Sequence, residues 1–112
     1  MLFRSYFGDS EIIGRPRTDA SVFHSYHLYV IEIPNRDDIQ KQLLELGIET
    51  KVHYPKLITN QIAFINKFGN SKNITKAQFQ SKRILSLPIH HHLSTNQLEF
   101  VGSQLKNVLR II

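Results

Sequence analysis

Hydrophobic and polar positions change their period twice in the first half of the chain. Residues 26–33 are almost all β-branched, aromatic or aliphatic, which predicts a strand buried on most of both faces. Ile39, Leu43 and Leu46 then follow at spacings of four and three, which predicts the apolar stripe of a helix. In residues 48–54 apolar and polar side chains alternate, so we expect a second strand with one packed face and one polar face.

Both ends of the predicted helix carry local signals. Asn35 is a suitable N-cap because its short side chain can accept a hydrogen bond from an amide of the first turn. Asp37 and Asp38 add negative charge at the positive end of the helix dipole. Gly47 stands where helices commonly close through a left-handed residue. The helix is therefore expected to begin after Asn35 and to end at Gly47.

The second half of the chain predicts shorter elements. Short helices are expected at residues 61–68 and 75–83. They are separated at residues 69–73 by a turn or loop rich in residues that tolerate tight backbone geometry. A short strand is expected at residues 85–89, where Pro88 cannot donate to a ladder and so suits an edge or a strand end.

The last predicted helix is the best marked. Ser94 and Gln97 have the spacing of a capping box, and Leu93 and Leu98 have that of a hydrophobic staple. An apolar stripe continues along the helix and is expected to face the core: Leu98, Val101, Leu105, Val108 and Ile112.

The predicted order is strand, helix, strand, helix, helix, strand, helix. This order predicts an α+β domain with a small, mainly antiparallel sheet and helices packed largely on one face. A chain of 112 residues is long enough for one core and too short for a second domain. We expect residues 1–24 to be a lead-in, made of a helix end and a loop, and residues 25–112 to be the folded domain.

Charge is unevenly divided between the two halves. Residues 1–50 hold five Lys/Arg and eight Asp/Glu, whereas residues 51–112 hold nine Lys/Arg and one acid, Glu99. Such a basic half attracts anions, such as a nucleotide pyrophosphate, an anionic surface or an acidic polypeptide, or it is simply a solvated surface. The basic residues are scattered and no nucleic-acid recognition signature is present, so nucleic acid is not an expected partner.

Several other sites and locations are not expected. The chain has no cysteine, no apolar run of membrane-spanning length and no signal-peptide pattern, so we expect a cytoplasmic protein without a membrane partner. Three consecutive histidines at residues 90–92 cannot easily aim at one ion, so a polar loop is expected there and no metal site. No phosphate-binding glycine loop or nucleophile motif marks a complete catalytic site, and no catalytic residue is predicted.

Four segments of the sequence resemble one enzyme family. They are SYHLYVIEI followed by NRD, LGI at 46–48, HYP at 53–55, and LSLPIH at 85–90. Together they resemble the C-terminal small domain of the DegT/StrS-type aminotransferases. The resemblance runs from about residue 25 to the end, and residues 1–24 are similar to the connecting helix and variable loop that precede this domain.

The resemblance implies a function for the complete family fold. These enzymes use pyridoxal phosphate (PLP) to aminate keto sugars on nucleotide carriers, for surface polysaccharide synthesis. Their large domain supplies the Schiff-base lysine, and this chain has no segment that resembles it. We therefore expect the chain alone to be inactive and to bind no cofactor. The implied partners are a PLP-binding large domain or partner chain, a sugar nucleotide and a second copy in a homo-oligomer. The alternative is a non-enzymatic remnant, or a self-associating or anion-binding interaction module.

The resemblance also indicates substrate-side residues. His53, Tyr54 and Gln61 match the HYP motif and the glutamine that follows it in the family, and His53 shares the polar face of its predicted strand with Lys51. Each has a structural alternative, since Tyr54 could belong to the core, Gln61 could cap a helix and His53 could be a solvated strand residue. Where the family often has Pro and His between HYP and the glutamine, this chain has instead Leu57 and Thr59.

Overall fold

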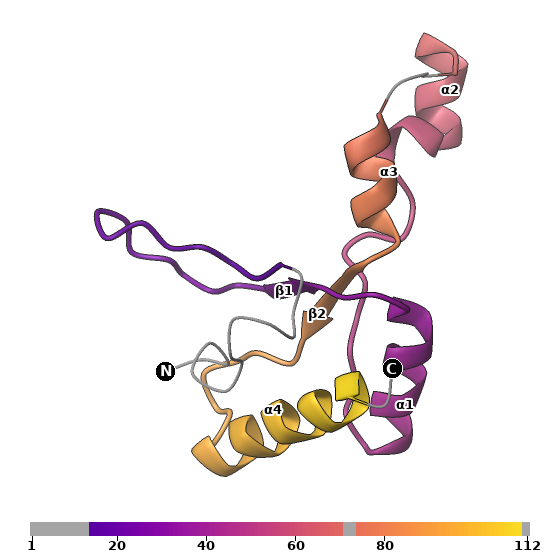
Figure 1. Cartoon of the computed structure of the whole chain (residues 1–112). Coiled ribbons are helices and arrows are strands. Elements are labelled where there is room, and N and C mark those ends of the chain that lie inside the picture. The colour runs from indigo at the N-terminus through magenta and orange to yellow at the C-terminus, as the bar shows by residue number, and fades with distance from the viewer. Residues whose placement is uncertain (1–13, 71–73, 111–112) are drawn as a thin grey trace.

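The computed structural model describes residues 14–70 and 74–110. Its elements follow one another along the chain as drawn in Figure 1: β1 (Tyr29–Glu32), α1 (Arg36–Glu45), η2 (Ile58–Asn60), α2 (Ile62–Phe68), α3 (Thr75–Ser81), β2 (Ile84–Leu87) and α4 (Thr95–Arg110). Most of the predicted lead-in helix end, and Ile112 of the predicted stripe, lie outside the described residues.

The sheet is small and antiparallel. β1 and β2 pair antiparallel along their whole length. One further antiparallel bridge lies on each outer side, between Gly14 and Glu32 beside β1 and between Lys51 and Ser86 beside β2. The prediction of an α+β domain with an antiparallel sheet is therefore confirmed.

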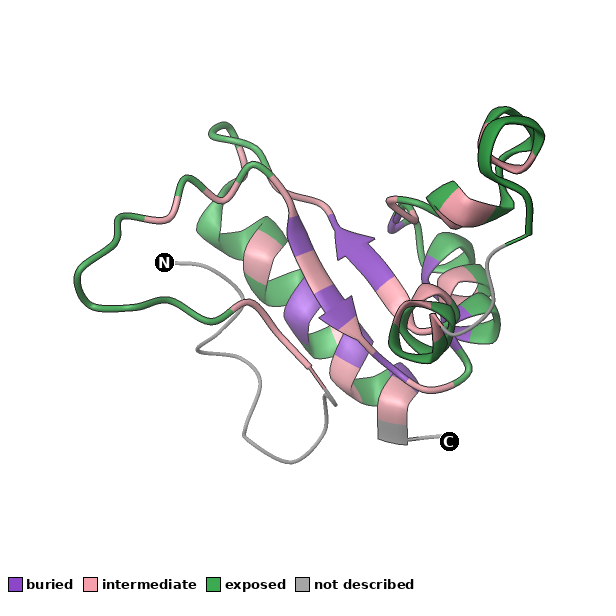
Figure 2. Cartoon of the chain, turned by 90° about the horizontal axis from the view of Figure 1, so that it is seen from above, coloured by how far each residue is buried: buried purple, intermediate pink, exposed green. Residues whose placement is uncertain are grey.

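One face of the sheet carries the core. Alternate strand residues point to this face, and α4 runs beneath it in Figure 2, while α1 packs against α4 and β2. This arrangement confirms that helices cover mainly one face. The buried hydrophobic residues come from these elements and the segments that follow them: Tyr29, Ile31, Ile33, Ile39, Leu43, Ile48, Leu85, Leu87, Val101, Leu105 and Val108.

Helix α1 closes as predicted at Gly47. This glycine has a φ of 82°, and its amide donates to the Leu44 carbonyl at 2.9 Å. The amide of Ile48 donates to the Leu43 carbonyl at 2.8 Å. These two bonds form a Schellman motif, and the buried side chains of Ile48 and Leu43 belong to the same core.

The start of α1 differs from its prediction. Asn35 is the N-cap residue, but its backbone is left-handed, with a φ of 49°, and its side chain makes no capping hydrogen bond. Side-chain capping normally needs an extended N-cap backbone that turns the side chain toward the first turn, so the Asn35 capping prediction is wrong. Asp37 and Asp38 lie in the first turn as expected.

The predicted strand at residues 48–54 is also wrong. Its alternation is real as far as Thr50, since Ile48 and Thr50 are buried, but this segment joins the sheet only through the bridge at Lys51. The Thr50 carbonyl instead accepts a hydrogen bond from Gln40 Nε2 at 3.0 Å, so a helix side chain takes an acceptor that a strand partner would use. Tyr54 is then 72% exposed and cannot be a core residue.

The first strand is shorter than predicted at both ends, and its predicted first residue, Tyr26, cannot belong to it. This residue has a φ of 50°, which no strand residue adopts, and β1 begins only at Tyr29.

In the loop that precedes β1, the amide and the hydroxyl of Ser21 both donate to Asp19 Oδ1 and lower the pKa of Asp19.

Helix α4 agrees with its sequence signals. The amide of Gln97 donates to Ser94 Oγ at 3.2 Å, and the amide of Ser94 donates to Gln97 Oε1 at 2.9 Å, which confirms the capping box. Val101, Leu105 and Val108 are buried as predicted. Within the described part of the chain, no helix combines the length and hydropathy needed to span a membrane.

Candidate functional site

A cleft of about 510 Å³ lies between the 47–53 segment, the end of β2 and the first half of α4. Its lining is aliphatic over much of its area and also includes Phe100. The polar part of the lining consists of three imidazoles, one lysine, one carboxylate, one hydroxyl and one amide: His27, His53, His90, Lys51, Glu49, Ser86 and Gln97. A cleft with an apolar lining and a few convergent polar groups is the usual form of a small-molecule site.

His53 is held in this cleft by the sheet. A hydrogen bond of 2.8 Å joins its Nδ1 to the hydroxyl oxygen of Ser86, which is buried in β2. The same serine donates its amide to the Lys51 carbonyl at 2.7 Å and accepts from the Lys51 amide at 3.2 Å. Ser86 therefore fixes both the backbone beside β2 and the imidazole ring that follows two residues later.

Sequence reasoning found His53 but missed Ser86. A signal was present, because Ser86 is the one polar residue in the otherwise apolar strand Ile84–Leu87. A polar side chain in a buried strand needs a partner, and such a residue is a natural support for a site. The pairing with His53 depends on where residues 51–53 lie beside β2. No local sequence pattern contains that position.

The other two predicted residues lie outside the cleft lining. Tyr54 is exposed, and its ring stands edge-on to the His53 ring with centroids 5.4 Å apart. Gln61 is exposed at the N-cap position of α2, where its side chain makes no capping hydrogen bond. The structure thus brings His53 and Tyr54 together and leaves Gln61 on a separate element.

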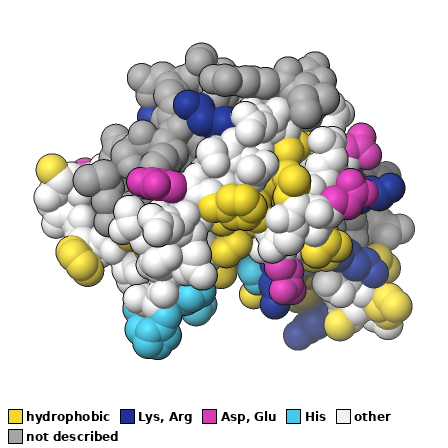
Figure 3. Space-filling view, turned by 90° about the horizontal axis from the view of Figure 1, so that it is seen from below, with side chains coloured by type: hydrophobic (Ala, Val, Ile, Leu, Met, Phe, Trp, Pro, Cys, Tyr) yellow, Lys and Arg dark blue, Asp and Glu magenta, His cyan; other side chains and the backbone are white. Residues whose placement is uncertain are grey.

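The consecutive histidines form a surface cluster. His90, His91 and His92 are all exposed, and the rings of His91 and His92 lie 3.9 Å apart between centroids. Figure 3, which views the molecule from below, shows a group of histidine side chains at one edge of this face. Among the described residues, no set of three or more His, Cys, Asp or Glu side chains could hold a metal ion.

Comparison with known families identifies the fold. The sequence profile of the DegT/DnrJ/EryC1/StrS aminotransferase family matches residues 2–106. The chain belongs to this family. The resemblance to DegT/StrS-type aminotransferases is therefore confirmed.

Two relatives show how much of the family fold the chain spans. It is 29% identical over 100 residues to a pleiotropic regulatory protein of Geobacillus stearothermophilus, a match that covers 89% of this chain and 27% of that protein. It is 30% identical to the UDP-2-acetamido-2-deoxy-3-oxo-D-glucuronate aminotransferase of Pseudomonas aeruginosa, over 85% of this chain and 26% of that enzyme. The chain therefore spans about a quarter of these relatives' length.

Solved structures of the family contain the same fold. The crystal structure of S. venezuelae DesV superposes with a TM-score of 0.88 at 24% identity, over 98% of this chain and 30% of DesV. The PLP form of a protein described as a sugar aminotransferase from Streptococcus pneumoniae superposes with a TM-score of 0.84 at 26% identity, over 97% of this chain and 29% of that chain.

The described lining of the cleft does not fit PLP. Lys51 is its one lysine and is exposed, whereas a lysine that forms a cofactor imine needs a pocket that holds its amine against the cofactor. The phosphate of a cofactor is commonly held by free amides at a helix N-terminus. At α4 the amide of Gln97 is already bonded to the Ser94 side chain. These residues form a cleft without the cofactor's anchoring groups.

Proposed function

We propose that this chain is the substrate-side part of a PLP-dependent aminotransferase that acts on a keto sugar carried by a nucleotide, in deoxyamino-sugar synthesis for surface polysaccharides. The observation that carries the proposal is the family match over residues 2–106. A relative at 30% identity is by name an aminotransferase of UDP-2-acetamido-2-deoxy-3-oxo-D-glucuronate, a keto sugar on a nucleotide carrier. The substrate of the assembled enzyme is of the same class.

The chain alone is inactive in this proposal. When bound, PLP supplies the electron sink for amino-group transfer. The poor fit of the cleft lining supports a cofactor site on the family's remaining length, either in the same polypeptide or in a partner chain. The contribution of this chain is then to bind and orient the sugar nucleotide and to exclude water from one side of the site.

His53 is the proposed substrate contact within the cleft. An imidazole fixed through Nδ1 by Ser86 can offer Nε2 to a hydroxyl or phosphate oxygen. Lys51 adds positive charge for a pyrophosphate, and the apolar lining offers a surface to a sugar or base ring. Tyr54 and Gln61 lie outside the cleft lining, so we propose that they contact substrate only when the rest of the family fold is present.

Titration of the chain with UDP-N-acetylglucosamine, followed by calorimetry or NMR, tests the cleft. We expect His53→Ala to weaken binding about tenfold, which corresponds to one lost hydrogen bond to a charged group. His92→Ala is the matched control, because His92 is exposed and does not line the cleft. Equal losses in both variants would contradict the assignment of His53.

Addition of PLP tests the cofactor claim separately. We expect no imine absorbance from the chain alone. An imine band that disappears when a single lysine is substituted would overturn the claim. Binding of neither PLP nor the nucleotide sugar would favour the second candidate, a non-enzymatic interaction module, which is supported by the exposed apolar side chains of η2, α2 and α3.

A further inference from the structure

The hydroxyl of Ser86 is buried and has one hydrogen-bond partner among the described residues. Ser86 is 4% exposed, and its Oγ lies 2.8 Å from His53 Nδ1. Within the described part of the chain, neither this hydroxyl nor the His53 ring forms a second hydrogen bond. The pair can therefore be arranged in two ways, with either the hydroxyl or the imidazole as the donor.

Only one of these arrangements satisfies the serine. A buried hydroxyl carries a proton that needs an acceptor. If Nδ1 donates, the Ser86 proton has no acceptor among the described residues, which is unfavourable for a buried group. If Ser86 donates, Nδ1 accepts and the proton of the neutral ring lies on Nε2. We propose that Ser86 is a positioning residue that donates to His53 Nδ1 and so keeps the proton of the neutral imidazole on Nε2, the ring nitrogen left for a ligand.

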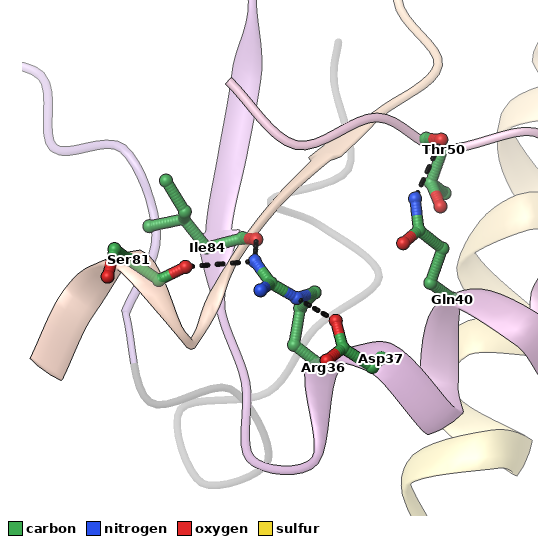
Figure 4. A network of polar contacts seen from close by, with 6 residues as sticks. All are labelled: Arg36, Asp37, Gln40, Thr50, Ser81 and Ile84. Carbon is green, nitrogen blue, oxygen red and sulfur yellow. Dashed lines mark hydrogen bonds and ion pairs between the residues drawn. The ribbon is translucent and has the colours of Figure 1, made fainter. Parts of the chain in front are cut away.

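The backbone before His53 keeps the ring at this hydroxyl. Gln40 Nε2 donates to the Thr50 carbonyl at 3.0 Å, as drawn in Figure 4. At the next residue, two backbone hydrogen bonds between Lys51 and Ser86 join the segment to β2. The segment is thus held at two successive residues shortly before His53. The contact between Oγ and Nδ1 is therefore built into the folded chain and does not require a ligand.

A fixed tautomer selects the chemistry of the ligand. A neutral ring with its proton on Nε2 donates from that atom and cannot accept there. The matching ligand group is an acceptor oxygen, and a charged phosphate oxygen makes a stronger bond than a neutral one. His53 is then a donor to the pyrophosphate of the nucleotide carrier and not a base that takes a proton at Nε2. This step of the inference rests on the proposed function.

Nitrogen-15 NMR of the histidine rings tests the tautomer in the unaltered chain, at about pH 9, above the ordinary titration range of imidazole. His53 should show a proton on Nε2 and none on Nδ1. His24 is an internal reference, because its Nδ1 accepts from the Tyr26 amide at 2.8 Å and its neutral ring must carry the proton on Nε2. His92 is exposed and should give signals averaged between the two tautomers.

Two variants test whether the Ser86 hydroxyl is the cause. Ser86→Ala removes the donor, so the His53 nitrogen signals should move toward the averaged signals of His92. Ser86→Thr keeps a hydroxyl and should restore the single tautomer. If the two tautomers become equally populated in Ser86→Ala, about half of the molecules can donate from Nε2, and the affinity for UDP should fall about twofold. Unchanged His53 signals in Ser86→Ala would overturn the assignment.

The outcomes separate this inference from the proposed function. A proton on Nδ1 of His53 in the unaltered chain would overturn the inference, whether or not the variants fold. A proton on Nε2 in a chain that binds neither UDP nor UDP-N-acetylglucosamine supports the assignment of Ser86 and favours the non-enzymatic module over the proposed function. A shift of the Nε2 signal with UDP, but not with N-acetylglucosamine, supports the phosphate contact. Binding of UDP without that shift, or a shift with N-acetylglucosamine alone, would overturn the contact.

Discussion

The body of the molecule consists of β1, β2, α1 and α4, and the arm consists of the described residues of 56–83, which contain η2, α2 and α3. The two regions are built from similar local signals and have opposite surroundings. In the body, β1, β2, α1 and α4 bury their apolar faces against one another. In the arm, α2 and α3 have seven residues each and bury none. Isolated helices this short are marginal in water, and most helical stability in proteins comes from packing of an apolar face. The comparison teaches that the body buries its apolar side chains, whereas the arm leaves its own exposed.

The largest expected effect is a loss of unfolding free energy from a substitution in the body, compared with a substitution in the arm. Leu105 is fully buried in α4, so Leu105→Ala should lower the free energy of unfolding by about 2 to 5 kcal/mol. Ile62→Ala in the arm should change it by less than about 0.5 kcal/mol, because Ile62 is 70% exposed. Urea unfolding followed by circular dichroism measures both. Equal losses would mean that the arm contributes to the core.

The next effect acts at the junction of the two regions. Arg36→Ala removes a buried guanidinium and leaves the carbonyls of Ser81 and Ile84 without its donors. A hydrogen bond to a charged group contributes about 1.5 to 3 kcal/mol. We therefore expect Arg36→Ala to lower the free energy of unfolding by at least the contribution of one such bond. Lys41→Ala on the exposed side of α1 is the control. If the two variants unfold at the same urea concentration, Arg36 does not anchor the arm.

A smaller effect compares two glycines with positive φ, one in each region; Gly69 has a ψ of −175°, a combination that essentially only glycine adopts. Gly47 and Gly69 have φ values of 82° and 76°, and a Cβ on either would meet no atom within 4 Å. A left-handed L-residue costs about 1 to 2 kcal/mol, so Gly47→Ala should lower the unfolding free energy by that amount. Gly69→Ala should lower it by less, since strain at the end of α2 can be relieved by local opening of the arm. A thermal melt that shifts more for Gly69→Ala would reverse the comparison.

The sequence predicted features that depend on near neighbours in the chain. The Ser94–Gln97 capping box, the left-handed Gly47 and the stripe through Leu105 are each confirmed, because helix periodicity and capping act over a few residues. Asn35 failed because an N-cap residue can also adopt a left-handed backbone, in which its side chain does not reach the first turn.

Features that depend on distant contacts were not predictable. The alternation at 48–54 does not reveal that Gln40 takes the Thr50 carbonyl, so the expected strand reduces to one bridge at Lys51. His53 was found through a motif, whereas its support from Ser86 arises from packing between segments 33 residues apart in the chain. The sequence likewise predicted short helices at 61–68 and 75–83 without indicating that they bury no residue in the described chain.

Hydrogen exchange of the chain alone tests the central claim most directly. The account predicts slow exchange in β1, β2, α1 and α4, at rates set by global unfolding, and fast exchange throughout α2 and α3. Protection of α2 and α3 equal to that of α4 would contradict it, because the arm would then be part of one cooperative core and not a segment with an exposed apolar surface.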